Sequence, residues 1–255
     1  MNTNSNVYTV VYTTVICVLV AAILAFVSQS LKPMQEDNEK AETISQILTA
    51  GRFGEKEELA KKGNKAIIKM FQNELDHAAL VNAEGKEVRN LDKAHAEVYS
   101  TSDLKAEGYK LSDASFEIPV YIFNNGVHVF PVYGAGLWGP IWGYVAMDAS
   151  LTHIVGAYFD HASETPGLGG KIKDDPSFRA ALAGKTLNMA GSKHFEIVKG
   201  GAPAGQTNAI DAISGATMTS QGLEDAINVW IKAYKPVFDA APACGECTES
   251  ESSEN

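Results

Sequence analysis

Residues 118–130 read IPVYIFNNGVHVF, two runs of β-branched and aromatic residues on either side of Asn124-Asn125-Gly126. Runs of this kind are typical of β-strands. An Asn-Gly turn between two such runs is a strong short-range signal for a hairpin. The sequence therefore predicts an antiparallel pair of strands at 118–123 and 127–130.

Similar short runs occur on both sides of this hairpin, and helical patterns interrupt them. Further strands are predicted at 78–81, 142–147, 154–159 and 195–198. Helices are predicted at 175–182 and from near Thr219 to a stop at Pro236. This order predicts an α+β fold in which helices pack on a single sheet.

The N-terminal segment is apolar and uncharged. No charged side chain occurs in residues 1–31, and 8–27 is long enough to cross a bilayer as a helix. A cleaved signal peptide would need a basic start, a shorter apolar core and a clear cleavage site. We therefore expect one transmembrane helix in residues 1–32, whose flanking charges do not fix its orientation.

Three further segments follow the expected anchor: a helical stalk at 33–75, one domain at 76–240, and an acidic tail at 241–255 expected to be disordered. The formal net charge of −10 works against a nucleic-acid partner. In the tail, Cys244 and Cys247 form a lone CxxC, which leaves a chance disulfide, free thiols and a metal or redox role open.

The segment DAISGATMTS at 211–220 places four hydroxyl side chains and Gly215 directly before an amphipathic helix. Unpaired backbone N–H groups and the positive end of the helix dipole favour a phosphate at such a position, and glycine allows close approach. An ordinary N-cap is the alternative interpretation of these residues.

A second candidate segment is ETPGLGG at 164–170. Its proline and glycines predict a tight loop with exposed backbone amides, while Glu164 supplies an acceptor and Thr165 a hydroxyl group. Such a loop can press on a flat ring and hydrogen-bond to its polar edge. An ordinary turn is the alternative.

Four other side chains could lie beside a bound ring or phosphate or have ordinary structural roles. Leu137 and Trp138 lie in a glycine-rich stretch and could flank a ring, although core packing is the equal alternative for Trp138 and the favoured one for Trp142. Lys199 could neutralise a phosphate or simply be solvated.

His153 and His161 are not spaced as metal ligands usually are, so no metal site is predicted. No Ser-His-Asp set or P-loop can be assembled, which argues against hydrolases and nucleotidases.

The pattern Asp-x-x-Ser-Gly-Ala-Thr at 211–217 resembles that of proteins whose last threonine is esterified to the phosphate of FMN by a dedicated flavin transferase. The chain resembles one such family from residue 8 to residue 217: NqrC, a subunit of sodium-translocating NADH:quinone oxidoreductases. The other segments that carry the resemblance are YTVV at 8–11, SLKP at 30–33, GLWGPIWG at 136–143, HASETPGLG at 161–169 and KGGAP at 199–203. The acidic tail at 241–255 does not match the sequence pattern of this family.

The resemblance implies covalent FMN on Thr217 and no catalytic side chain of the chain's own. The implied cofactor-binding residues, besides Thr217, are Ser214, Gly215, Ala216, Met218, Thr219, Glu164, Thr165, Leu168, Gly169, Leu137, Trp138, Lys199 and Asp211. Because no general base is placed beside Thr217 by the sequence, attachment by an external enzyme fits the local chemistry.

The resemblance also implies a place in a six-subunit complex of the inner membrane, with a single membrane span and a periplasmic domain. Electrons would come from an iron centre within the membrane subunits and pass to the FMN of NqrB. The small membrane subunits NqrD and NqrE would be further partners. The complex would oxidise NADH with ubiquinone or menaquinone and export sodium.

Three alternatives remain. RnfG, from Rnf-type ferredoxin:NAD oxidoreductases, shares the ETPGLG and SGAT elements, although the YTV opening and the GLWG segment are closer to the sodium pump. A stand-alone extracytoplasmic reductase would need a further substrate or haem domain. The third is a non-redox anchored binding domain. In such a domain the segment 211–220, which we call the threonine motif, would be an ordinary helix cap.

Overall fold

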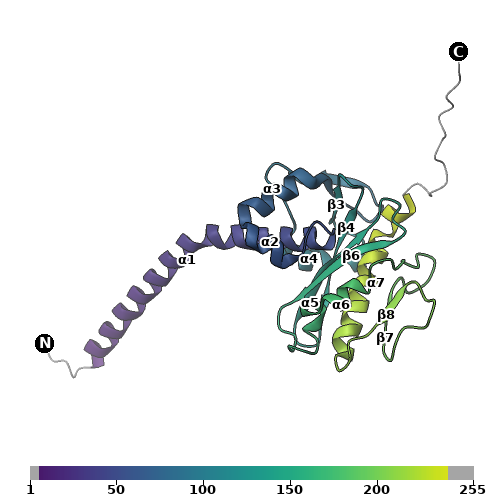
Figure 1. Cartoon of the computed structure of the whole chain (residues 1–255). Coiled ribbons are helices and arrows are strands. Elements are labelled where there is room, and N and C mark those ends of the chain that lie inside the picture. Colours follow the sequence, from purple (N-terminus) through teal and green to yellow (C-terminus); the bar gives the residue numbers. More distant parts are fainter. Residues whose placement is uncertain (1–5, 241–255) are drawn as a thin grey trace, which may run out of the picture.

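The computed structural model describes residues 6–240, and its longest element is a helix that leaves the domain (Figure 1). Helix α1 (Asn6–Ala50) has 45 residues and runs through Pro33 without a break. Residues 9–39 are exposed, and the N-terminal part is long and apolar enough to cross a membrane. This agrees with the predicted N-terminal membrane helix.

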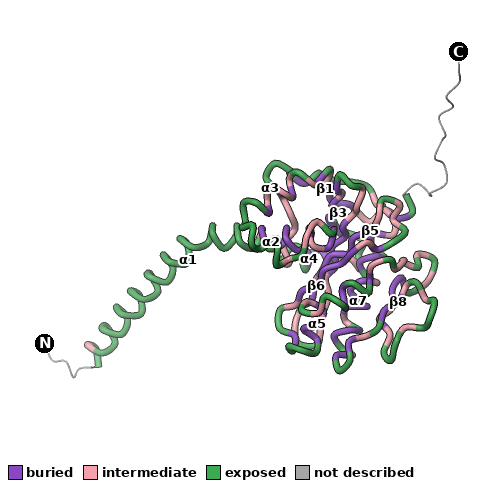
Figure 2. The backbone as a smooth tube through the Cα atoms, viewed as in Figure 1, coloured by how far each residue is buried: buried purple, intermediate pink, exposed green. Residues whose placement is uncertain are grey.

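The C-terminal end of α1 is part of the domain, as the change from exposed to buried residues along the helix shows (Figure 2). Ile44, Ile47 and Leu48 are fully buried there, together with Ala50. This part of the predicted stalk thus covers the sheet, because an apolar helix face gains free energy by leaving water.

The domain is built on a six-stranded antiparallel sheet in the order β2-β1-β3-β4-β5-β6. The predicted hairpin is confirmed: β3 (Ile118–Phe123) pairs with β4 (His128–Ala135) through Tyr121 and Val129. The other strands are β1 (Leu75–Val81), β2 (Glu87–Asn90), β5 (Pro140–Met147) and β6 (Ile154–His161). Exposed β2 has no apolar run and was not predicted.

Both faces of this sheet are covered, so its side chains enter two cores. Tyr144 packs toward α1 and helix α3 (Asn64–Glu74), whereas its neighbour Val145 packs with residues of helix α7 (Thr217–Ala240). This alternation follows from the pleat of the strand, which points successive side chains to opposite faces. The sheet therefore holds α1 and α7 on opposite sides of the domain.

Helix α7 differs from its prediction at both ends. It begins at Thr217 instead of near Thr219, and it continues past Pro236 to Ala240. The last turn is held by packing, since the ring of Phe238 stacks on Phe130 with centroids 5.0 Å apart. Tertiary packing here outweighs the helix-breaking tendency of proline.

The remaining elements surround the sheet. They are helices α2 (Lys56–Lys62), α4 (Thr101–Gly108), α5 (Lys171–Asp174) and α6 (Pro176–Ala180), the 3-10 helix η1 (Leu111–Asp113), and strands β7 (Glu196–Val198) and β8 (Ala209–Asp211). Strands β7 and β8 form a separate parallel pair. Strand β8 leads directly into the threonine motif and, like α4, was not predicted.

Candidate functional site

The threonine motif forms the turn between β8 and α7. The N–H of Ile213 donates to Ser220 Oγ at 3.1 Å, and the N–H of Ser220 donates to the carbonyl of Ala216 at 2.9 Å. Gly215 has φ of 79°, a left-handed conformation that glycine adopts without strain. These bonds make Thr217 the first residue of α7, where backbone N–H groups lack acceptors within the helix.

Glu164 joins this turn to two other segments. Its carboxylate is buried and accepts hydrogen bonds from Thr219 Oγ1 at 2.6 Å and from the N–H of Trp138 at 2.8 Å. A Cβ atom at Gly136 or Gly169 would collide with the same carboxylate, so both glycines make room for it. The three motifs predicted from the sequence therefore meet at one buried acceptor.

The segment 164–170 is a tight loop, as its proline and glycines predict. The carbonyl of Thr165 accepts from the N–H groups of Leu168, at 3.1 Å, and Gly170, at 3.0 Å. The side chain of Thr165 is exposed, and that of Leu168 lies next to Gly215. The loop thus rests directly on the threonine motif.

Four large apolar side chains around this junction face solvent. Trp138 is 66% exposed, Met218 58%, Leu137 50% and Leu168 42%. Trp138 is therefore not used in the core, whereas Trp142 is half-buried with its Nε1 donating to Gln46. Exposed apolar side chains gathered at one place are typical of a binding site. We call these four residues the apolar patch.

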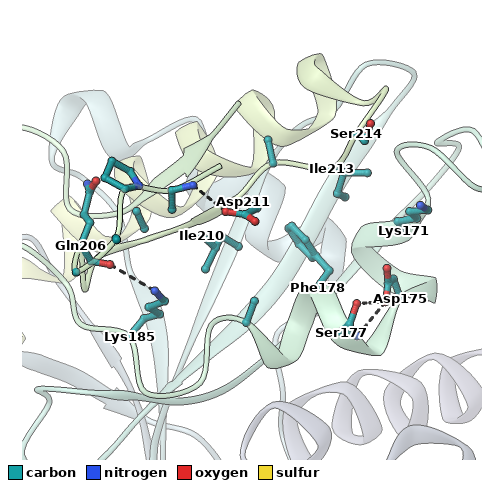
Figure 3. Close-up of a pocket in the computed structure, with 17 residues that line it drawn as sticks. Lys171, Asp175, Ser177, Phe178, Lys185, Gln206, Ile210, Asp211, Ile213 and Ser214 are labelled. Atoms are coloured by element: carbon teal, nitrogen blue, oxygen red, sulfur yellow. Dashed lines mark hydrogen bonds between the residues drawn. The ribbon is translucent and has the colours of Figure 1, made fainter. Parts of the chain in front are cut away.

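A cavity of about 570 Å³ borders the same turn (Figure 3). Asp211 and Ser214 of the motif line this cavity, and Lys171 and Lys185 are among the other residues that line it. The Asp211 carboxylate accepts from the N–H of Ala202 at 2.7 Å. No sequence pattern singled out the two lysines, since each lies in a short segment without a recognisable motif.

The predicted site residues therefore divide into two groups. Asp211 and Ser214 border the cavity, whereas the apolar patch and Glu164 lie beside the start of α7. Lys199 is exposed where β7 ends, next to the pair formed by Val198 and Asp211. The two groups meet at residues 214–217.

The two histidines set aside in the sequence have different surroundings. His153 is exposed, with Nδ1 at 3.3 Å from Asp148 Oδ2. His161 accepts the N–H of Glu164 on Nδ1 at 3.1 Å, and its buried Nε2 has no hydrogen-bond partner within residues 6–240. Across the same residues, no group of three His, Cys, Asp or Glu side chains could hold a metal.

Known proteins resemble this chain in the region of the site and beyond it. The family model described as FMN-binding domain matches residues 136–232. A crystal structure from Parabacteroides distasonis, of the Na(+)-translocating NADH-quinone reductase subunit designated C (NqrC), is 31% identical with a TM-score of 0.64. The match covers 82% of this chain and 96% of that one. The chain belongs to the NqrC family.

Two curated members of the NqrC family show how the likeness is distributed. The protein from Pseudomonas aeruginosa is 28% identical over 262 residues, which cover 94% of this chain and 95% of that protein. The protein from Vibrio vulnificus strain YJ016 is 38% identical over 117 residues. This shorter match spans about half the length of the relative, 46%, and 44% of this chain.

The FMN-binding domain of this NqrC family member contains the whole candidate site. Its matched range, 136–232, begins one residue before Leu137 and includes Glu164, Lys199 and Thr217. The range leaves out α1, which is the segment long and apolar enough to anchor the chain in a membrane.

Proposed function

We propose that this chain carries FMN as a phosphate ester of Thr217 and serves as a membrane-anchored electron-transfer subunit of the sodium-translocating NADH:quinone reductase. The observation that carries the proposal is the position of Thr217. It begins α7 beside the apolar patch, so a phosphate and an aromatic ring of one molecule would both find partners there.

The start of α7 suits the phosphate end of FMN. Backbone N–H groups at Thr217 and Met218 lack intrahelical acceptors, and the helix dipole adds partial positive charge. Gly215 lets a ligand approach the backbone closely. The ammonium group of Lys199, at the end of β7, would add a full positive charge from the adjoining loop.

The apolar patch suits the ring end. Trp138, Leu168 and Met218 come from three separate segments, and Glu164 fixes the first and the third relative to each other. When bound, the flavin supplies the electron-transfer chemistry, and the protein supplies its position and surroundings. The cavity beside Ser214 is the alternative place for the ring, and variants distinguish the two.

Attachment would require a separate flavin transferase. A threonine hydroxyl is a weak nucleophile unless a neighbouring base activates it. Within residues 6–240 the Thr217 hydroxyl donates no hydrogen bond to a carboxylate or an imidazole, and the nearby Glu164 carboxylate already accepts from Thr219 and Trp138. The chain would thus be the substrate of the attachment step.

Family membership and the apolar length of α1 support the proposal for the larger assembly. In this proposal α1 crosses the inner membrane once, and the domain lies on the periplasmic side. Electrons arrive from an iron centre within the membrane subunits and leave for the FMN of NqrB, and the small membrane subunits NqrD and NqrE are further partners. NADH oxidation by quinone and sodium export are then properties of the complex.

Mass spectrometry tests the covalent attachment. The full chain, produced together with the transferase, should gain the mass of one FMN less water on the peptide containing Thr217, and acid-precipitated protein should stay fluorescent. Both signals should vanish in Thr217→Ala and persist in Thr152→Ala, which removes an exposed threonine hydroxyl outside the motif. Flavin released entirely by acid would overturn the ester, and an absence of flavin would favour a non-redox binding domain.

A pair of variants tests where the ring lies. Trp138→Ala should change the visible spectrum of the attached flavin, because it removes the largest exposed side chain of the patch. Ser177→Ala, at the far wall of the cavity, should leave that spectrum unchanged. The reverse result would place the ring in the cavity.

A further inference from the structure

The loop formed by residues 161–170 is closed by an ion pair between the elements on either side of it. Asp160 lies at the end of β6, and Lys173 lies in α5 just after the loop. Lys173 Nζ is 2.8 Å from Asp160 Oδ1, and Asp160 is only 3% exposed. A buried carboxylate needs such partners, because an unpaired charge in the interior is costly.

The same carboxylate is held from the side of α1. Gln46 is buried, and its Nε2 donates to Asp160 Oδ2 at 3.0 Å. Its Oε1 accepts from Trp142 Nε1 at 3.1 Å, which fixes the orientation of the amide. Lys56 Nζ adds a longer ion pair to Asp160 Oδ2 at 3.9 Å.

Consecutive hydrogen bonds lead from Asp160 into the candidate site. Its Oδ1 accepts the N–H of His161 at 2.7 Å, and His161 Nδ1 accepts the N–H of Glu164 at 3.1 Å. The Glu164 carboxylate then receives the bonds from Trp138 and Thr219. Residues of α1, of the loop and of the start of α7 therefore belong to one connected set of polar contacts.

We propose that Asp160 is a positioning residue for the loop of residues 161–170. It closes this loop through Lys173 and ties it to the membrane helix α1 through Gln46. Removing one partner of a buried ion pair leaves the other charge uncompensated, so the loop should open more often. The flavin role of the loop rests on the proposed function, whereas its attachment to α1 does not.

Hydrogen exchange on the full chain in detergent, produced without the transferase, tests the closure without any flavin. In Lys173→Met, the amides of Leu168 and Gly170 should exchange about tenfold faster than in the wild type, because local opening sets their protection. Lys110→Met is the matched control. It removes a lysine 2.7 Å from another nearly buried carboxylate, Glu107, on helix α4 and outside the loop.

The control separates loop positioning from general destabilisation. Lys173→Arg should restore the protection of Leu168 and Gly170, and Gln46→Met should weaken it although the Asp160–Lys173 pair remains. Equal loop exchange in Lys173→Met and Lys110→Met would overturn the proposal. Unchanged loop exchange in a folded Gln46→Met would overturn the tie to α1.

A second readout uses the flavin-loaded chain. The midpoint potential of the attached flavin should shift in Lys173→Met and return in Lys173→Arg, while Lys110→Met keeps the wild-type value. A potential identical in all four proteins would overturn the positioning role. If no flavin attaches to Thr217, the proposed function fails, but the exchange experiment still decides whether Asp160 closes the loop.

Discussion

At the scale of single residues, the hydroxyl of Thr219 holds the buried Glu164 carboxylate in place. Thr219→Val keeps the shape of the side chain but removes the donor at 2.6 Å from Oε2. A buried acceptor left without its partner costs about 1–3 kcal/mol. We expect the free energy of unfolding to fall by about that amount in urea titrations followed by circular dichroism.

Thr186→Val is the control for this prediction. The Thr186 hydroxyl also bonds to a side-chain oxygen, that of Thr207 at 2.8 Å, but the pair is exposed. Water can replace an exposed partner, so the free energy of unfolding should fall by no more than about 0.5 kcal/mol. Similar losses in Thr219→Val and Thr186→Val would contradict the structural role of the buried bond.

Individual site residues could be predicted only where a local pattern specifies them. Gly215 and Thr217 belong to a contiguous motif, and the structure places them in the turn and at the start of α7. The contacts of Glu164 could not be predicted, because its partners lie 26 and 55 residues away. Asp160 was missed for the same reason, since its partner Gln46 is 114 residues away.

At the scale of elements, Gly222 sets how closely α7 packs on β4. A Cβ atom there would collide with the carbonyl oxygen of Ala135. Glycine to alanine normally stabilises a helix interior by about 1 kcal/mol. We expect Gly222→Ala to lower the free energy of unfolding by about 1–3 kcal/mol instead, because the helix must move away from the strand.

Gly108→Ala on α4 is the matched comparison, measured by the same denaturant titration. Its new Cβ would lie at an ordinary 3.6 Å from Trp230 Cζ2, and its φ is not positive. The change should be neutral or stabilising by up to about 1 kcal/mol. A Gly222→Ala variant that is as stable as Gly108→Ala, or more so, would contradict the close contact between α7 and β4.

The turn between β5 and β6 should contribute a pH-dependent part of the stability. Burial alone would raise the pKa of Asp148, but the N–H groups of Thr152 and His153 donate to its carboxylate and hold the pKa below its ordinary value. A lowered folded-state pKa stabilises the protein above the unfolded pKa, about 3.9 for aspartate, and this stability is lost as pH falls through the folded pKa.

Thermal melts of the wild type and Asp148→Asn from pH 7 to pH 2.5 check the pH-dependent stability expected from Asp148. The variant should melt at a lower temperature at pH 7, and the gap should narrow below about pH 4 as the wild-type carboxylate becomes protonated. A gap that stayed constant over the whole range would show that the charge of Asp148 does not matter.

The elements themselves were predictable where they are strongly patterned. The hairpin of β3 and β4 has a regular pattern and an Asn-Gly turn, whereas β8 has only three residues and no period to detect. The end of α7 was placed wrongly at Pro236, because the contact of Phe238 with Phe130 depends on residues about a hundred positions apart.

At the scale of the whole molecule, the membrane helix and the domain share one element. Ile44, Ile47 and Leu48 are fully buried against the sheet, although they belong to the same helix as the exposed apolar segment. The buried end of α1 therefore precedes residue 76, where the domain was expected to begin. The core on this face of the sheet needs α1 from about residue 41 onward.

Two truncations test this division of α1. Removing residues 1–32 should give a soluble, cooperatively folding domain, because residues 9–39 make no buried contacts in the chain. Removing residues 1–50 should abolish cooperative unfolding, since it uncovers one face of the sheet and each fully buried aliphatic side chain lost costs about 1.5–3 kcal/mol. Circular dichroism melts of the two proteins distinguish these outcomes. If the domain beginning at residue 51 melted at the same temperature as the one beginning at residue 33, the end of α1 would be an attached stalk and not part of the core.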